Sequence, residues 1–254
     1  MTTTQGAAAV AKPSPAAELP ILYRKSRVWF ASFAVPAAPV QALLPDPSLQ
    51  VVRYMPGQAV FTVAVFEYSD TSIGPYGELG IGFPVRHNHS TAIPLWPLLA
   101  EKWLDDLGPW VQMLPVDTEV AHEAGKRNWG FPKFIAKIDI DTTADRMKCV
   151  VSEAGRKIIS IEVDKPSPKT EPIHFPFRLW SKLGDELLYT ALDVDAVGCV
   201  KKLGARAKVT LEDHPRTAEL QALGVNDAKC IEVRWFDEYR TALDRAKSRF
   251  RIGH

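Results

Sequence analysis

The sequence predicts a β-rich α+β fold made by a single domain over residues 21–254. Twenty prolines and fifteen glycines divide the 254-residue chain into short segments, which favours strands over long helices. Between these breaks, several segments are rich in β-branched and aromatic residues, and only three have the spacing of a helix. A domain of this length can bury a substantial apolar core.

Five segments have the pattern of strands. Residues 58–68 are almost continuously apolar, as in a strand that is buried on both faces. The other four alternate between apolar and polar residues, so one face of each would meet a core and the other water; they are residues 137–140, 157–163, 208–211 and 229–235.

Three segments have the spacing of helices. Apolar residues recur every four positions over residues 99–107. Residues 215–223 predict a short helix that begins after an Asp-His pair and ends at Gly224. Residues 237–251 carry apolar side chains at helical spacing among charges, which predicts a terminal amphipathic helix.

Composition and charge narrow the class of protein. Apolar residues make up 46% of the chain and charged residues 24%, and the net charge is +1, so we expect neither nucleic acid nor a membrane as partner. No stretch approaches the roughly 20 apolar residues that span a bilayer. Residues 1–20 are rich in Ala, Pro, Thr and Ser and lack a secretory pattern, which predicts a flexible tail. We therefore expect a soluble, cytoplasmic protein.

Neither a disulfide framework nor a metal site is expected. The cysteines are odd in number and widely spaced, at Cys149, Cys199 and Cys230, which favours a reducing compartment. His87 and His89 form a His-x-His pair, but the spacing supplies no third ligand.

The most informative segment is residues 125–134, Gly-Lys-Arg-Asn-Trp-Gly-Phe-Pro-Lys-Phe. It places Lys133 directly after a Gly-Phe-Pro turn and within an aromatic and apolar run. Two interpretations stay open: the ammonium reaches water on its long stem, or it points into an apolar cavity, where desolvation favours the neutral amine. A neutral amine in a cavity is a nucleophile that forms Schiff bases with carbonyl compounds.

Two further charged residues lie in unusual settings. Glu78 is the single charge between Asp70 and Arg86, in an apolar, glycine-rich segment. A carboxylate there must face solvent, pair with a cation or become protonated. Arg27 lies where a charged segment gives way to an apolar strand, and it is either a surface residue or a bidentate clamp for a carboxylate.

Three segments, in this order, resemble the acetoacetate decarboxylase superfamily over roughly residues 20–240. Arg27 and the aromatic strand after it resemble the family's N-terminal substrate-binding arginine. Residues 75–78 (Pro-Tyr-Gly-Glu), followed by Phe-Pro-Val, resemble the segment of the active-site glutamate. Residues 130–133 (Gly-Phe-Pro-Lys) resemble the motif that carries the Schiff-base lysine.

The resemblance implies a large curved antiparallel sheet that closes into a barrel or cone around an apolar cavity, with a few peripheral helices. It also implies that Lys133 is the nucleophile, that Glu78 orients the substrate or relays protons, and that Arg27 holds the substrate carboxylate. We add the aromatic residues of these segments as expected substrate contacts, namely Tyr76, Trp129 and Phe134. No metal or organic cofactor is implied; the implied partners are a small keto acid and further copies of the chain in a homo-oligomer.

The sequence departs from the family's pattern at two places. The decarboxylase has a second lysine directly after the nucleophile, and here that position is Phe134. Activation would then rest on desolvation, with three nearby cations as candidate helpers: Lys126, Arg127 and Lys137. Residues 95–110 also form an insertion rich in Trp, Leu and Pro, which could be a lid, a cavity wall or an oligomer contact.

Three functions stay open at this stage. The first is a Schiff-base lyase, with decarboxylation of a β-keto acid placed before aldol or dehydration chemistry on a 2-oxo acid. The second is a non-catalytic binder of an apolar carbonyl or lipid-like ligand. The third is a structural subunit whose insertion mediates assembly.

Overall fold

Strands dominate the computed structural model, which describes residues 17–88, 104–167, 169–202 and 204–252. In chain order its elements are β1 (Ile21–Pro36), α1 (Ala37–Ala42), β2 (Leu49–Val51), β3 (Arg53–Met55), β4 (Gln58–Thr71), β5 (Tyr76–His87), β6 (Gly108–Val116), α3 (Glu119–Trp129), β7 (Lys133–Ile135), β8 (Lys137–Thr142), β9 (Arg146–Glu153), β10 (Arg156–Asp164), β11 (Glu171–Leu183), β12 (Glu186–Lys201), β13 (Ala207–Leu211), the 3₁₀ turn η1 (Pro215–Thr217), α4 (Ala218–Gln221), the 3₁₀ turn η2 (Val225–Asp227), β14 (Cys230–Leu243) and β15 (Ser248–Arg251). All five predicted strand segments are observed as strands, with Lys229 lying one residue before the start of β14.

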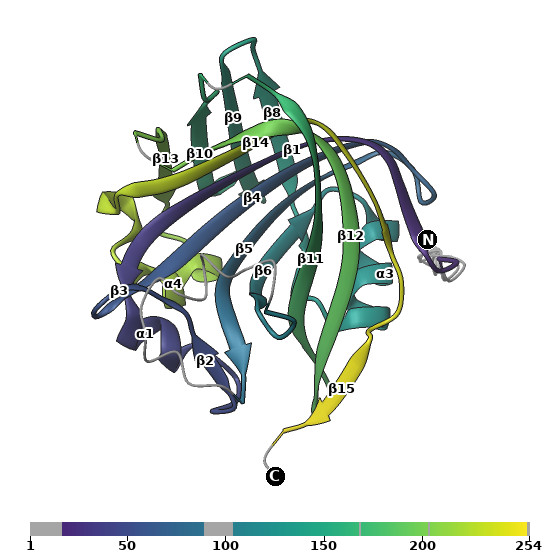
Figure 1. Cartoon of the computed structure of the whole chain (residues 1–254), viewed down its shortest axis with the longest axis vertical. Coiled ribbons are helices and arrows are strands. Elements are labelled where there is room, and N and C mark those ends of the chain that lie inside the picture. Colours follow the sequence, from purple (N-terminus) through teal and green to yellow (C-terminus); the bar gives the residue numbers. More distant parts are fainter. Residues whose placement is uncertain (1–16, 89–103, 168, 203, 253–254) are drawn as a thin grey trace, which may run out of the picture.

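Seven strands close into a barrel (Figure 1). Their order is β5-β4-β1-β14-β12-β11-β6, and β6 pairs with β5 to complete the ring. Every pairing in the ring is antiparallel except that of β11 with β6, which is parallel. The expected curved sheet that closes into a barrel is confirmed, with this one parallel junction.

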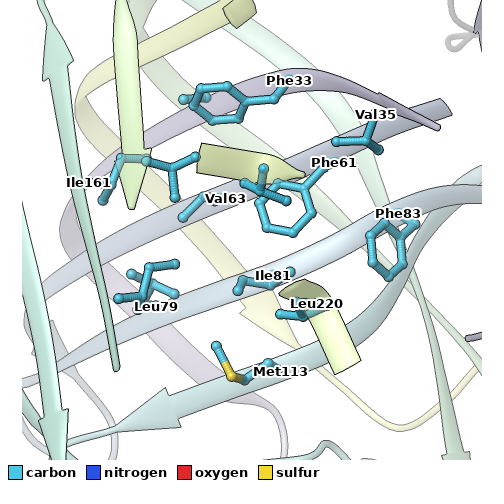
Figure 2. Close-up of a cluster of buried hydrophobic side chains, with 14 of the residues drawn as sticks. Phe33, Val35, Phe61, Val63, Leu79, Ile81, Phe83, Met113, Ile161 and Leu220 are labelled. Atoms are coloured by element: carbon cyan, nitrogen blue, oxygen red, sulfur yellow. The ribbon is translucent and has the colours of Figure 1, made fainter. Parts of the chain in front are cut away.

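The outer face of the barrel is covered by a second sheet. Its strand order is β13-β10-β9-β8, and it packs with α4 against β1, β4 and β5. Figure 2 shows Val63 of β4 and Ile81 of β5 in the same cluster as Ile161 of β10 and Leu220 of α4. This core is buried, and it packs against one wall of the barrel from outside.

Alternate residues of the same strands face the barrel interior. Phe30 of β1 and Phe66 of β4 lie there with their ring centroids 5.8 Å apart, in an edge-to-face arrangement. Side chains of α3 join this inner cluster as well, through Ala121, Ala124 and Trp129. The barrel interior is therefore a second core, separate from the one beneath the four-stranded sheet.

The short helix predicted over residues 215–223 is observed as η1 followed by α4. His214 is the residue that opens it, because its imidazole nitrogen Nδ1 accepts a hydrogen bond from the backbone N–H of Arg216 at 3.2 Å. Gly224 follows the helix with a φ of +63°, a left-handed conformation that favours glycine.

The terminal helix predicted over residues 237–251 is wrong, because this segment forms strands. β14 continues to Leu243 between β1 and β12, and β15 pairs with β12. The two flanking strands satisfy the backbone hydrogen bonds of β14 on both sides, and Tyr239 and Leu243 are buried in the inner core. Tertiary pairing has overridden the local helical spacing.

Residues 99–103 of the predicted helix and most of the 95–110 insertion lie outside the described residues, and the described residues 104–107 are not helical. The described end of that segment is a turn at Asp105–Asp106 followed by β6, so residues 108–110 belong to the barrel wall. The first sixteen residues of the expected tail also lie outside the described part of the chain. Within the described residues, no helix has the length and apolar character that crossing a membrane requires.

Candidate active site

A tight turn after α3 sets the position of Lys133. α3 ends at Gly130, whose φ of +62° is left-handed, and a Cβ on this residue would lie 2.0 Å from the carbonyl oxygen of Lys182. The backbone N–H of Lys133 then donates to the carbonyl of Phe131 at 2.7 Å, which closes a three-residue turn around Pro132. Lys133 opens β7, which pairs in parallel with β6 at Leu114.

Gly125 of α3 makes room for the lysine stem. A Cβ at Gly125 would lie 2.5 Å from both Cδ and Cε of Lys133, closer than real Cβ contacts come. The glycine is therefore required by the neighbouring side chain, although its backbone is an ordinary part of the helix.

Lys133 and Glu78 form a buried pair. The amine Nζ donates to Glu78 Oε2 at 2.6 Å, and the side chains are only 5% and 8% exposed. Glu78 lies on β5 between Phe66 of β4 and Val116 of β6, so both neighbouring strands fix its backbone. Of the two interpretations of Lys133, the structure selects the buried side chain.

Four buried tyrosines, here called the tyrosine cluster, surround this pair: Tyr23, Tyr68, Tyr76 and Tyr239. The hydroxyl groups of Tyr23 and Tyr76 lie 3.1 Å apart, and the Tyr76 ring centroid is 5.7 Å from Lys133 Nζ. Burial raises the pKa of all four hydroxyl groups, and the Glu78 carboxylate raises each further. The cluster therefore presents neutral phenols to the lysine and the glutamate.

Lys133 and Glu78 line a cavity of about 740 Å³ inside the barrel. Most of its wall is apolar and comes from the inner core, including Phe30, Phe66 and Leu192. Met55 and Lys202 also line it and are themselves more than half exposed, so they mark its mouth. The expected apolar cavity is present, and a buried amine and acid lie in its wall.

The structure does not bring Arg27 to this pair. Its guanidinium pairs with Glu67 on the neighbouring strand β4, with Nη2 2.6 Å from Oε2, and lies 5.7 Å from the ring centroid of Trp29. Trp29 belongs to the outer core, whereas the adjacent Phe30 lines the cavity. Arg27 therefore lies on the opposite face of β1, and the predicted clamp for a substrate carboxylate has no support in this geometry.

Phe134 and Trp129 are also placed away from the cavity. Phe134 follows Lys133 in β7, so it points to the other face, where its ring contacts the Arg216 guanidinium at 4.1 Å. Trp129 is fully buried and donates its indole N–H to the carbonyl of Asp244 at 2.9 Å. Phe131, which stacks on Trp129, supplies the aromatic wall instead.

The three cations proposed as helpers lie on the surface. Lys126 and Arg127 are exposed residues of α3, and Lys137 pairs with Asp139 with 72% of its side chain exposed. A second cation beside Lys133 is therefore not supplied by these residues.

The residues missed by sequence reasoning are Tyr23, Tyr68 and Tyr239. Each lies on a different strand, and strand pairing brings them together: Ser26 faces Tyr68 on one side and Tyr239 on the other. Spacing along the chain carries no signal for such a cluster, because it depends on the register of three strands.

Two groups of side chains in the chain are of types that can bind metals. The His87 ring packs against Trp180 and Phe250, with centroids 5.0 and 4.3 Å away, and His89 lies outside the described residues. The side chains of Glu119, His122 and Glu123 on α3 offer ligand atoms within 4.8 Å of one another. Acidic helix faces of this kind are common without a metal, so neither position defines a metal centre.

The fold and the site together define a class of protein: a closed mixed barrel whose interior cavity presents a buried lysine paired with a glutamate. The chain matches the acetoacetate decarboxylase (ADC) family over residues 7–245, and it therefore belongs to that family.

Solved structures show the same fold. An acetoacetate decarboxylase from Legionella pneumophila subsp. pneumophila str. Philadelphia 1 is 14% identical with a TM-score of 0.63, over 97% of this chain and 99% of that one. The enduracididine biosynthesis enzyme MppR, complexed with pyruvate, is 15% identical with a TM-score of 0.63, over 95% and 93%. An acetoacetate decarboxylase-like enzyme from Sphingomonas wittichii RW1 is 14% identical with a TM-score of 0.56, over 98% and 100%. No curated protein matches the chain in sequence.

Proposed function

We propose that this protein is a Schiff-base lyase that acts on a keto acid without a cofactor, and that decarboxylation of a β-keto acid is its reaction. The observation that carries the proposal is the buried Lys133 amine, 2.6 Å from Glu78 in the wall of an apolar cavity. Membership of the acetoacetate decarboxylase family supports the same chemistry.

Glu78 is the proposed proton acceptor for Lys133. The hydrogen bond between Nζ and Oε2 lets the ammonium pass a proton to the carboxylate, which leaves a neutral amine. The amine attacks the ketone carbon, and the proton on Glu78 passes to the hydroxyl of the adduct. That hydroxyl leaves as water, which gives an iminium ion bonded to Lys133 and restores the Glu78 carboxylate.

Decarboxylation then transfers electrons into the iminium. The bond between the α-carbon and the carboxylate breaks, CO₂ leaves, and the electron pair forms an enamine with the nitrogen. Glu78 then takes up a proton from solvent and passes it to the enamine carbon, and water hydrolyses the resulting iminium to release the ketone and restore the ammonium of Lys133 beside the Glu78 carboxylate. The products are one ketone and one CO₂ for each β-keto acid.

The charges around the cavity favour loss of the carboxylate over its retention. Besides Lys133, the cationic residues lining it are Arg178, Lys202 and Arg234, and each is paired with an acid. Arg178 lies beside Gly108 of β6, whereas Lys133 pairs with Leu114 of the same strand. Gly108 and Leu114 are six residues apart, which is about 20 Å along a strand. A substrate carboxylate beside Glu78 is therefore repelled and poorly solvated, and both effects are relieved when CO₂ departs.

Reductive trapping tests the proposal. Incubation with acetoacetate or pyruvate followed by borohydride is expected to reduce the iminium and leave a stable adduct on Lys133, located by peptide mass spectrometry. Lys133→Ala is expected to lose both the adduct and CO₂ release, and Lys137→Ala, which removes an exposed lysine, is the matched control. Absence of an adduct on Lys133 with every short keto acid would refute a Schiff-base enzyme.

The same experiment separates the two reactions of the iminium. Pyruvate lacks a β-carboxylate, so its adduct cannot lose CO₂ in this way. If the pyruvate adduct condenses with an added aldehyde and acetoacetate releases no CO₂, the reaction is aldol or dehydration chemistry. That result would retain Lys133 as the nucleophile and replace decarboxylation as the reaction. The pyruvate complex of the relative MppR makes pyruvate a suitable second probe.

A further inference from the structure

We propose that the cavity selects β-keto acids with an extended apolar chain, of medium length, over acetoacetate. The part of this inference that concerns the keto acid group rests on the proposed function. The part that concerns the apolar chain rests on the size and lining of the cavity. The first observation is size: a volume of about 740 Å³ is in the upper part of the range of pockets that hold drug-sized ligands. Acetoacetate would leave most of this space filled by water against apolar walls.

Strand register orders the cavity wall into rows. Glu78 lies in a row with Phe66 and Val28. The second row contains Gly80, Ala64 and Phe30, and the third contains Gly82, Thr62 and Ser32. From Glu78 to Gly82 is four residues along β5, or about 13 Å. The rows therefore measure depth from the reactive pair toward the mouth.

The middle row is apolar and partly open. Gly80 and Ala64 present little or no side chain, and Phe30 lies across from Phe177 with ring centroids 5.9 Å apart. In the third row the wall becomes polar, where the hydroxyls of Ser32 and Thr62 lie 3.1 Å apart. An apolar channel thus runs from Lys133 to a polar rim.

The chemistry of a β-keto acid fixes how it would lie. A single carbon separates its ketone from its carboxylate, so both must lie at the Lys133 end when the iminium forms. The substituent on the other side of the ketone then has one direction in which to extend, along the middle row toward Met55 and Lys202 at the mouth. An alkyl chain there replaces water against aromatic and aliphatic walls, which is favourable in proportion to the area buried.

A chain-length series tests the inference. Initial rates of CO₂ release are compared for acetoacetate, 3-oxohexanoate, 3-oxooctanoate, 3-oxodecanoate and 3-oxododecanoate, each giving the corresponding methyl ketone. We expect kcat/KM to rise by up to about fourfold for each added methylene and to level off once the chain reaches the Ser32–Thr62 rim. A value of kcat/KM that stays constant or falls from acetoacetate onward would overturn the inference.

Narrowing the channel should change this profile. Ala64→Leu adds bulk in the middle row, and we expect it to lower the ratio of kcat/KM for 3-oxodecanoate to that for acetoacetate by about tenfold. Ala222→Leu makes the same exchange at an exposed residue of the turn after α4, and its ratio should equal that of the unmodified protein. Equal ratios in Ala64→Leu and Ala222→Leu would contradict the proposed path of the chain.

A binding measurement separates failure of this inference from failure of the proposed function. Calorimetry with methyl ketones from acetone to 2-undecanone is carried out on Lys133→Ala, in which no Schiff base can form. A Kd that falls steadily with chain length supports the channel even if trapping at Lys133 fails. A Kd that does not respond to chain length overturns the inference even if trapping succeeds.

Discussion

Lys133 and Glu78 share one buried hydrogen bond, and the position of its proton decides whether the amine can attack a carbonyl. In the ion pair the lysine is inert as a nucleophile, and with the proton on Glu78 it is reactive. The residue after Lys133 is Phe134 and not a second lysine, and its ring contacts Arg216 on the other face of β7. In the proposed mechanism, activation of Lys133 therefore depends on burial and on a carboxylate that can accept and return a proton.

Glu78→Gln tests this role at the scale of one residue. The amide has the shape of the carboxylate and can still accept a hydrogen bond from Lys133, but it cannot take its proton. We expect kcat for CO₂ release to fall by about 10²- to 10⁴-fold, the usual contribution of a general acid–base group. Glu67→Gln, which removes the partner of Arg27 on the outer face, is the control and should leave kcat unchanged. Full activity of Glu78→Gln would rule out proton transfer through this residue.

At the scale of elements, α3 and β7 together aim the lysine. The helix ends at the left-handed Gly130, the chain turns at Pro132, and β7 then pairs with β6. The stem of Lys133 lies against the helix at Gly125, where no Cβ fits. The Gly-Phe-Pro-Lys motif and the upstream glycine therefore form one positioning device.

Gly125→Ala should separate stability from activity. Alanine is favoured over glycine in a helix by up to about 1 kcal/mol, which offsets part of the cost of crowding the buried lysine stem, so the free energy of unfolding should fall by no more than about 2 kcal/mol. The new Cβ displaces the flexible lysine stem, and a misplacement of this kind can lower kcat by about 10²-fold. Denaturant unfolding and CO₂ release would be measured together, with Lys126→Ala on the exposed face of α3 as control. A loss of activity matched by a loss of stability would argue for a purely structural role.

At the scale of the whole molecule, the barrel keeps two cores apart. The outer core, beneath the four-stranded sheet, is packed and holds β1, β4 and β5 in place. The inner core leaves a cavity, and the tyrosine cluster lies at the reactive end of it. The strands are therefore packed against a second sheet on one face and line an open space on the other.

We expect the tyrosine cluster to make the folded protein less stable as the pH rises into the alkaline range. Burial raises the pKa of its four hydroxyls, whereas in the unfolded chain they ionise near pH 10. Above about pH 10 the unfolded state binds fewer protons than the folded state, so the free energy of unfolding falls as pH rises. Each tyrosine contributes up to about 1.4 kcal/mol per pH unit to the slope of this fall. Well below pH 10 the hydroxyls are protonated in both the folded and the unfolded state, so they contribute nothing to the slope.

Urea unfolding between pH 9 and pH 11 checks this dependence. Tyr239→Phe removes one of these hydroxyls, so the free energy of unfolding should fall less steeply with pH, by up to about 1.4 kcal/mol per pH unit. Tyr54→Phe, at a partly exposed tyrosine of β3, is the control and should leave the slope close to that of the unmodified protein. An unchanged slope in Tyr239→Phe would show that this hydroxyl does not stay protonated in the fold.

Local patterns in the sequence determined the strands, the lysine motif and the buried glutamate. Apolar runs and alternation predicted β4, β8 and β10. A lone carboxylate in a glycine-rich segment left three outcomes for Glu78, namely solvent, a cation or protonation, and the structure pairs it with a cation. These predictions held because burial and local backbone preference act over a few residues. The resemblance to a known family, carried by the same motifs, extended them to the barrel.

Only the tertiary structure decided which side chains meet. The face of β1 on which Arg27 lies, the outward direction of Phe134 and the meeting of the four tyrosines follow from the pairing of distant strands. The segment after residue 237 became a strand because β1 and β12 offered hydrogen bonds on both sides of it. Register shifts of one residue exchange the two faces of a strand, and no spacing within a single segment determines that register.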